Sequence, residues 1–451
     1  MKLCKYPVLA ITLIVILLQS ILTKSLCADW PRFRGPNGSG VAVGGEAIPV
    51  RWSKTENLAW KLPLPGPGAS SPIIVGGAAY VTCYSGYGLD RKKPGEIQNL
   101  KRNLVCVDFK TGTLRWAREI PARLPEDPFD RSGVSSHGYA SHTVVSDGIH
   151  VFCFFGKGGV YAFDPEGREL WNTAVGTGSD PPVWGSSSSP ILFEDYLIVT
   201  AAAESQAIIA YEKTTGREVW RYQSTGLDGM WGTPALQSRS DNQVDLVMMV
   251  AGELWSLDPV QGKLRWKMPA TESRQAYTNV QVVGARLFGS SGQNGGSFAV
   301  ELDDVSEDQL PLRLWENNVA ATYASPVVNE GKIYLVSRGI LTVMDANDGS
   351  VLKKQRLEGS RETGNRRFGS LDYASPVIAN SKLYWLNASG QTFVFDLDDE
   401  IRQVAVNDLG SPQEVFWGTP AVARGRMILR SSKFLYCVKT DGEVDGPSEL
   451  P

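Results

Sequence analysis

The hydrophobic positions of this chain fall into short runs, and Gly, Pro, Asp or Asn separates one run from the next. Runs such as 79–83 and 104–109 are rich in Val, Leu, Tyr, Phe and Cys, a composition typical of strands bounded by turns. The pattern favours many short strands over long helices. It therefore predicts an all-β fold.

One four-residue motif, a Ser or Thr followed by Pro and two apolar residues, recurs along the chain. From Pro190 onward its register advances by 44, 46, 46, 50 and 44 residues. Such a period indicates a supersecondary unit that needs its neighbours to bury its faces. Six copies begin at Ser71, Ser189, Thr233, Ser325, Ser375 and Thr419, and the gaps hold two degenerate copies, Ser141-His142-Thr143-Val144 and Asn279-Val280-Gln281-Val282. In the first of these, His142 replaces the Pro.

A second motif, an Asp-x-x-x-Gly turn followed by a strand that ends in Trp, recurs inside the units. Asp can hydrogen-bond the backbone of the turn that it opens and Gly allows positive φ, so the spacing predicts a tight hairpin. We expect the Trp to pack against the next unit. The copies run from Asp108 to Trp116, from Asp164 to Trp171, from Glu212 to Trp220 and from Asp258 to Trp266. Lys353 takes the Trp position in the sixth unit, and the motif is lost around Asp396 in the seventh.

Four short antiparallel strands per unit at this period predict an eight-bladed β-propeller. The last unit, residues 419–439, shows only three strands, and a stray strand with Trp60 precedes the first unit. Pairing the two would close the ring and cover both sheet edges. We therefore predict that the N-terminal strand completes the last blade.

The N-terminus has the order of a secretory signal. Lys2 and Lys5 precede an apolar run from Val8 to Leu22, and small residues follow up to Ala28. We interpret residues 1–28 as a signal peptide and residues 29–451 as one propeller domain. The alternative is an uncleaved signal anchor, which would be the one route to a membrane. The expected location is periplasmic or secreted.

Charge and cysteine content exclude some function classes. The chain of 451 residues has 45 Lys+Arg and 48 Asp+Glu, and loss of the three lysines in residues 1–28 leaves a net charge of −6. Such a balance gives no reason to expect binding to nucleic acid. Of the six cysteines, four remain after residues 1–28, and with neither a CxxC nor an adjacent pair they are too few for a disulfide scaffold. We expect Cys83, Cys106, Cys153 and Cys437 to be buried small hydrophobes.

The position two residues before the Ser or Thr of each motif, here called the slot, carries the clearest candidate site. In a propeller the loops that lead into the innermost strands open on one end of the central channel. A ring of aromatic side chains there would stack a planar or sugar-like ligand. The alternative is that these rings wedge between neighbouring blades. The candidates are Tyr139, Trp231, Tyr277, Tyr323, Tyr373 and Trp417, with Trp184 three residues before Ser187; Ala69 and Ser187 fill the two remaining slots.

Three long insertions, residues 85–103, 120–138 and 359–372, are predicted to reach the same end. They bring Arg366 and Arg367, our further ligand candidates, together with Arg91, Lys92 and Lys93, while Arg274 and Asp228 come from shorter connections. The Arg and Lys residues of this set could form a rim for an acidic ligand or simply be solvated. The chain has three histidines, His137, His142 and His150, but they lie on a loop, in a repeat motif and on a separate strand, so we predict no metal site. No catalytic residue stands out by spacing.

With these motifs in view, the chain resembles the pyrroloquinoline-quinone-like (PQQ-like) repeat propellers. The stretch from Val105 to Trp116 is similar to the tryptophan-docking motif of that family, and the start Asp29-Trp30-Pro31-Arg32-Phe33-Arg34-Gly35 resembles that of its exported members. The family contains quinoprotein dehydrogenases and a non-enzymatic outer-membrane assembly lipoprotein, so the fold does not decide the function. In its enzymes, the resemblance implies PQQ held against an adjacent cysteine pair, with a calcium ion. This chain has no such pair.

We therefore expect an exported, non-catalytic binding or assembly scaffold with a ligand in the axial funnel. The alternative is a PQQ-dependent dehydrogenase, or another enzyme that uses the funnel. The partner could be a small molecule, a glycan or a protein, and the cofactor stays open between none and PQQ with calcium.

Overall fold

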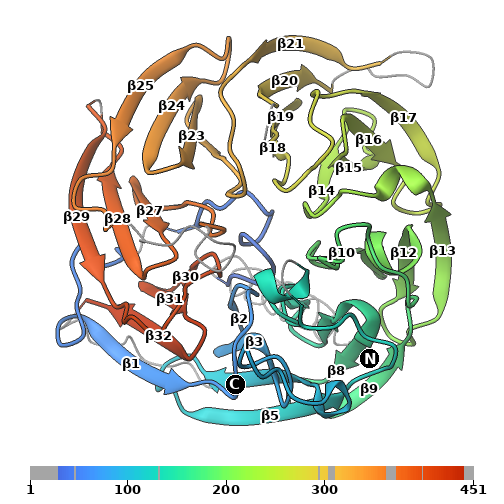
Figure 1. Ribbon diagram of the computed structural model, residues 1–451. Helices are drawn as coiled ribbons and strands as arrows, with labels where there is room; N and C mark the ends of the chain where they lie inside the picture. Colours follow the sequence, from blue (N-terminus) through green and yellow to red (C-terminus); the bar gives the residue numbers. More distant parts are fainter. Residues whose placement is uncertain are drawn as a thin grey trace, which may run out of the picture.

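The computed structural model describes residues 29–44, 47–130, 133–292, 295–302, 310–361, 372–398 and 400–440. The strands form eight four-stranded sheets arranged in a ring, as predicted (Figure 1). In each sheet the strands run antiparallel, and the first strand of blades one to seven lies innermost. The described residues contain only one α-helix, α2 (Ala202–Ser205), of four residues.

The strand bounds follow the predicted period. Blades one to four consist of β2 (Ile73–Val75), β3 (Ala78–Ser85), β4 (Lys101–Asp108) and β5 (Leu114–Pro121); β6 (Val145–Ser146), β7 (Val151–Phe154), β8 (Val160–Phe163) and β9 (Glu169–Thr173); β10 (Ile191–Phe193), β11 (Tyr196–Ala201), β12 (Ala207–Glu212) and β13 (Glu218–Gln223); and β14 (Ala235–Ser238), β15 (Val244–Val250), β16 (Glu253–Leu257) and β17 (Leu264–Pro269). Blades five to eight consist of β18 (Gln281–Val283), β19 (Arg286–Ser290), β20 (Ser297–Glu301) and β21 (Leu312–Asn317); β22 (Val327–Asn329), β23 (Lys332–Ser337), β24 (Ile340–Asp345) and β25 (Val351–Arg356); β26 (Val377–Ala379), β27 (Lys382–Leu386), β28 (Gln391–Asp396) and β29 (Arg402–Asp408); and β30 (Ala421–Ala423), β31 (Arg426–Arg430) and β32 (Phe434–Lys439) with β1 (Leu58–Pro63).

The ring closes as the sequence predicted. Strand β1 pairs antiparallel with β32, with Trp60 opposite Cys437 and Pro63 opposite Phe434. The N-terminal strand thus becomes the outer strand of blade eight (Figure 1). Since a propeller leaves a sheet edge open unless its first and last strands pair, this closure covers the edge of β32.

The hydrophobic core lies between neighbouring blades rather than inside any one of them. The cluster that contains Tyr80 and Leu104 of blade one continues into Cys153 and Phe163 of blade two. Comparable clusters join the following pairs of blades. Each sheet therefore depends on its neighbours to bury its faces. The four described cysteines are buried and free, as predicted.

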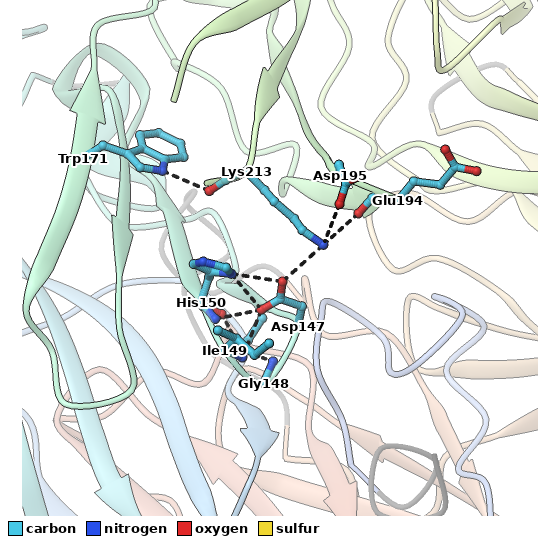
Figure 2. Close-up of polar contacts among 9 residues, drawn as sticks. Asp147, Gly148, Ile149, His150, Trp171, Glu194, Asp195 and Lys213 are labelled. Atoms are coloured by element: carbon cyan, nitrogen blue, oxygen red, sulfur yellow. Dashed lines mark hydrogen bonds and ion pairs between the residues drawn. The ribbon is translucent and has the colours of Figure 1, made fainter. Parts of the chain in front are cut away.

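Tryptophans dock blades one, two, three, five and eight onto the blade that follows. Trp171 of β9 donates its indole N–H to the carbonyl of Lys213, 3.0 Å away (Figure 2). The ring of Trp171 lies on Gly216, whose φ is +72°. A Cβ on Gly216 would meet that ring at 2.5 Å, so the turn needs glycine for both its conformation and its contact. Trp60 on Gly112, Trp116 on Gly167, Trp220 on Gly262 and Trp315 on Gly349 repeat this arrangement.

Polar contacts reinforce the same joint between blades two and three. The Lys213 ammonium lies 3.6 Å from a carboxylate oxygen of Asp147 and 3.4 Å from one of Asp195 (Figure 2). His150 bonds to Asp147, with 3.1 Å between Nδ1 and Oδ2. In the sixth blade Lys353, in the tryptophan position, donates to the carbonyls of Glu400 and Ile401 at 2.6 Å each. This lysine therefore keeps the hydrogen bond of the docking motif without the ring.

The N-terminal segment forms a plug across the channel, a role that the sequence did not reveal. Trp30 exchanges backbone hydrogen bonds with Ile74 of blade one, at 2.8 and 2.9 Å, and Ala42 donates to Ile378 of blade seven at 2.8 Å. Between them, the fully buried Arg34 donates to the carbonyl of Pro326 at 2.6 Å. Figure 1 shows this blue segment in the middle of the ring. The motif that resembles exported family members therefore closes one end of the channel.

In the part of the chain that the structure describes, we find no helix with the length and apolar character needed to cross a membrane.

Candidate functional site

A closed belt of hydrogen bonds surrounds the channel. In every blade one Ser, Thr or Asn side chain accepts a hydrogen bond from the backbone N–H of the equivalent residue in the preceding blade, with N···O distances of 2.8 to 3.0 Å. The last bond, from Thr419 to Ser71, closes the circle at 2.8 Å. The members are Ser71, Thr143, Ser189, Thr233, Asn279, Ser325, Ser375 and Thr419. The repeated motif thus supplies the inner wall of the ring.

The belt corrects the register that the sequence suggested for blade two. Thr143, not Ser141, occupies the belt, so Val144 rather than His142 stands at the Pro position. A shift of two residues keeps the same strand face, so the hydrophobic pattern could not reveal it. Ser141 therefore occupies the slot of blade two, and Tyr139 lies two residues earlier.

A cavity of about 150 Å³ lies on the axis, bounded by the belt, the slots and Phe33 of the plug. All eight slot residues line it: Ala69, Ser141, Ser187, Trp231, Tyr277, Tyr323, Tyr373 and Trp417. Trp184 and His137 complete the wall beside the small slots. The cavity thus has an aromatic arc over blades four to eight and a polar sector of small residues over blades one to three.

The aromatic side chains form an almost continuous surface. Trp231 stacks on Tyr277 with ring centroids 5.0 Å apart and an interplanar angle of 21°. Trp184 contacts Trp231 at 5.3 Å, and Tyr323 contacts Tyr277 at 5.0 Å and Tyr373 at 5.1 Å. These rings are half-buried and face the cavity and each other. The geometry therefore favours the lining interpretation over wedging between blades, while ligand binding at these residues stays a prediction.

Tyr139 does not line this cavity. It is 6% exposed, and its ring contacts Tyr84 at 5.4 Å and Phe129 at 6.2 Å. Its hydroxyl donates to the carbonyl of Asp127 at 2.7 Å. Tyr139 thus anchors the 120–138 insertion in a separate aromatic cluster, because in the register of blade two it lies two residues before the slot.

The cationic candidates are not brought into the cavity wall. Arg366 and Arg367 lie outside the described residues. Arg91, Lys92, Lys93 and Arg274 are exposed and are absent from the described lining. The described wall carries no carboxylate and only one imidazole, so its interior is close to neutral.

His137 and Ser141 form a polar pair in the small-residue sector. Nδ1 of His137 lies 2.5 Å from Oγ of Ser141, and Nε2 lies 2.7 Å from the carbonyl oxygen of Trp184. Burial lowers the pKa of His137, although the Trp184 carbonyl opposes this shift. The imidazole is therefore neutral at pH 7. Sequence reasoning missed this pair because the two residues belong to an insertion and to a misaligned slot.

A second, fully buried polar chain lies behind the same sector. Nε2 of His142 lies 2.9 Å from Oγ of Ser186, and that hydroxyl donates to Oε1 of Glu204 at 2.6 Å. Burial raises the pKa of Glu204 to about 7 and lowers that of His142 to about 3. His150 lies at the blade joint described above. Within the described residues, no three His, Cys, Asp or Glu side chains are placed to bind one metal ion.

The described residues do not fit a quinone with calcium. Calcium takes six to eight oxygen ligands, mostly carboxylates and carbonyls. Here the lining has no carboxylate, and the one amide, Asn279, already accepts from Thr233 at 2.9 Å. We therefore derive no step through that cofactor.

Comparison with known families decides where this propeller belongs. A family model described as outer membrane protein assembly factor BamB matches residues 101–355. The chain belongs to this family of PQQ-like propellers. The matched region runs from β4 of blade one to β25 of blade six.

Relatives outside the family model agree with this assignment. The outer membrane protein assembly factor BamB of Burkholderia pseudomallei is 24% identical over 377 residues, which are 72% of this chain and 83% of that protein. Among solved structures, BamB from Moraxella catarrhalis matches with a TM-score of 0.58 at 12% identity, covering 86% of this chain and 98% of that one. Quinohemoprotein alcohol dehydrogenase from Comamonas testosteroni matches with a TM-score of 0.62 at 12% identity, covering 96% and 84%. These two structures share the fold.

Proposed function

We propose that this protein is an exported scaffold for binding or assembly, and that its axial cavity holds one neutral, ring-sized group of a partner. The observation that carries the proposal is the cavity itself, which the plug closes at one end and which the aromatic arc lines. Aromatic rings stack well on planar groups and on sugar rings, and the belt hydroxyls can orient such a group. The neutral wall disfavours a strongly charged ligand.

Membership of the BamB family supports the assembly part of this proposal, because its described relative is an outer membrane protein assembly factor. A signal peptide at residues 1–28 would bring the chain to the compartment where such a factor acts. The poor fit to a quinone with calcium disfavours the dehydrogenase alternative. Reconstitution with PQQ and Ca²⁺ should therefore give neither stoichiometric uptake nor dye-linked alcohol oxidation.

Titration with neutral methyl pyranosides, followed by tryptophan fluorescence, tests the cavity. Trp184, Trp231 and Trp417 line the wall, so binding should change their emission. Trp417→Ala and Trp231→Ala should abolish the signal change and weaken binding at least tenfold. A uronic acid of the same size is the matched control and should bind more weakly. If the alanine variants bind as tightly as the native protein, the cavity is not the binding site.

A further inference from the structure

We propose that Ser141 and His137 form a nucleophile and general base that hydrolyse a small carboxylic ester held in the axial cavity. This activity goes beyond the scaffold role, and either can hold without the other. The two side chains lie in the wall of the cavity, opposite a surface suited to a flat apolar group.

The position of Ser141 makes its hydroxyl accessible from the cavity. It occupies the slot of blade two, where blades four to eight carry Tyr or Trp, and its neighbours in the slot ring are Ala69 and Ser187. These small residues leave space beside the hydroxyl. Ser141 is partly exposed, in contrast to the buried belt residue Thr143.

The hydrogen bonds of His137 define which ring nitrogen is the base. A backbone carbonyl can only accept, so the 2.7 Å contact with Trp184 places a proton on Nε2. In the neutral ring Nδ1 then carries the lone pair, and Ser141 must donate its hydroxyl proton to it across 2.5 Å. A serine hydroxyl bonded to a neutral imidazole that a third group orients is the arrangement that activates a nucleophile.

Local structure holds His137 in this position. The backbone N–H of His137 donates to the carbonyl of Val134 at 3.1 Å, at the end of the short 3-10 helix η2 (Val134–Ser136). The next residue, Gly138, has φ +81°, and a Cβ there would meet the ring of Tyr84 at 2.2 Å. Gly138 thus lets the chain turn against the aromatic cluster of Tyr139. The imidazole is positioned before any ligand arrives, which lowers the cost of reaching the reactive geometry.

The chemistry balances with water as the only co-reactant. Oγ of Ser141 forms a bond to the ester carbonyl carbon while its proton moves to Nδ1 of His137. The bond to the alcohol oxygen then breaks, and the alcohol leaves with that proton. Water attacks the acyl-serine, gives its proton to Nδ1, and Oγ is released with that proton. The products are a carboxylic acid and an alcohol, and the aromatic arc holds a ring-sized acyl or aryl group.

Covalent labelling with a fluorophosphonate, read by mass spectrometry, tests the nucleophile. The mature, folded protein should be labelled once, at Ser141, and Ser141→Ala should lose the label. This variant preserves the fold because Ala69 already occupies the equivalent slot in blade one. Ser238→Ala is the control, since Ser238 is an exposed serine of β14 that does not belong to the cavity lining. It should be labelled like the native protein.

Hydrolysis of p-nitrophenyl acetate tests the base. His137→Gln should lower the rate of labelling and of hydrolysis about 100-fold or more, since general-base catalysis contributes about that much. Its labelling should lose the dependence on pH that the native protein shows as His137 titrates. Unlabelled Ser141, a label on another serine, or equal rates for Ser141→Ala and the native protein would overturn the proposal. Binding of pyranosides measured in the same variants reports separately on the scaffold role.

Discussion

The belt and the slot ring lie only two residues apart in the segment that leads into each innermost strand, yet they are opposite in character. All eight belt positions carry Ser, Thr or Asn and make the same hydrogen bond. The eight slots change from Ala or Ser in blades one to three to Tyr or Trp in blades four to eight. A bond that every blade needs keeps one side-chain chemistry, whereas a wall that meets a ligand can differ from blade to blade. The belt is therefore structural, and the asymmetry of the slots points to function.

The two sectors of the slot ring differ in what lies behind them. Behind the aromatic arc, small residues such as Gly232, Ala324 and Gly418 separate slot from belt. Behind the small sector lies the buried chain of His142, Ser186 and Glu204. A buried imidazole and a buried carboxyl group thus lie on the side of the cavity that also holds the proposed nucleophile.

Loss of ring closure should have the largest effect on stability. All eight belt positions are equivalent only while the ring is closed. Deletion of residues 57–62 removes most of β1 and exposes the edge of β32. We expect the whole domain to lose its cooperative thermal transition, since each blade needs both neighbours. Circular dichroism during heating checks this expectation. An unchanged melting curve would show that closure by β1 is dispensable.

Removal of one belt acceptor should destabilise the fold without altering the slots. In Thr233→Val the backbone N–H of Ser189 loses its acceptor at 2.9 Å and stays buried. Such a loss costs about 1–3 kcal/mol of unfolding free energy. Thr233→Ser keeps the hydroxyl, as Ser does in four other blades, and should be nearly neutral. Denaturant titration of both variants gives the comparison, and equal losses would mean that the methyl group rather than the hydrogen bond matters.

The small sector should make stability depend on pH. Burial raises the pKa of Glu204 from 4.5 to about 7, a shift that Asp180 reinforces and Lys157 opposes. Between these values the folded state keeps a proton that the unfolded chain has released, so this contribution is complete below pH 4.5 and is lost as pH rises through about 7.

Glu204→Gln removes that titration while keeping a hydrogen-bond acceptor for Ser186. The melting temperature of the native protein minus that of this variant should therefore fall from pH 5 to pH 8. Taking the difference cancels the opposite pH dependence of His142 and His137, whose pKa values are lowered. A difference that stays constant or rises with pH would show that Glu204 is ionised in the folded protein.

The smallest expected effect is a difference in unfolding free energy between alanine variants of two tryptophans in the aromatic arc. The indole N–H of Trp231 donates to the carbonyl of Gly185 at 2.8 Å, whereas that of Trp417 has no partner in the described structure. Trp231→Ala should thus cost about 1 kcal/mol more unfolding free energy than Trp417→Ala. Both should abolish pyranoside binding. Equal stability losses would indicate that packing alone supports these slots.

Much of this architecture could be predicted because it repeats. The Ser/Thr-Pro motif located six of the eight belt residues, and its spacing located a seventh, Asn279. The Asp-x-x-x-Gly turn with its Trp predicted the docking that Trp171 makes on Gly216. The slot aromatics from Trp231 onward followed from the same alignment. Blade two was misaligned because it lacks the Pro, and a slip of two residues leaves the strand pattern unchanged. That slip named Tyr139 in place of Ser141.

The sequence alone determined the number of blades, the closing strand and the aromatic side of the cavity, since local turn chemistry and periodic packing recur in every unit and need no knowledge of distant contacts. Only the tertiary structure decided the plug and the Ser141–His137 pair. Both depend on residues that do not repeat: Arg34 meets Pro326 across the channel, and His137 reaches Ser141 and Trp184 through an insertion. Such contacts leave no periodic signal, because they form only when the ring brings different blades to one axis.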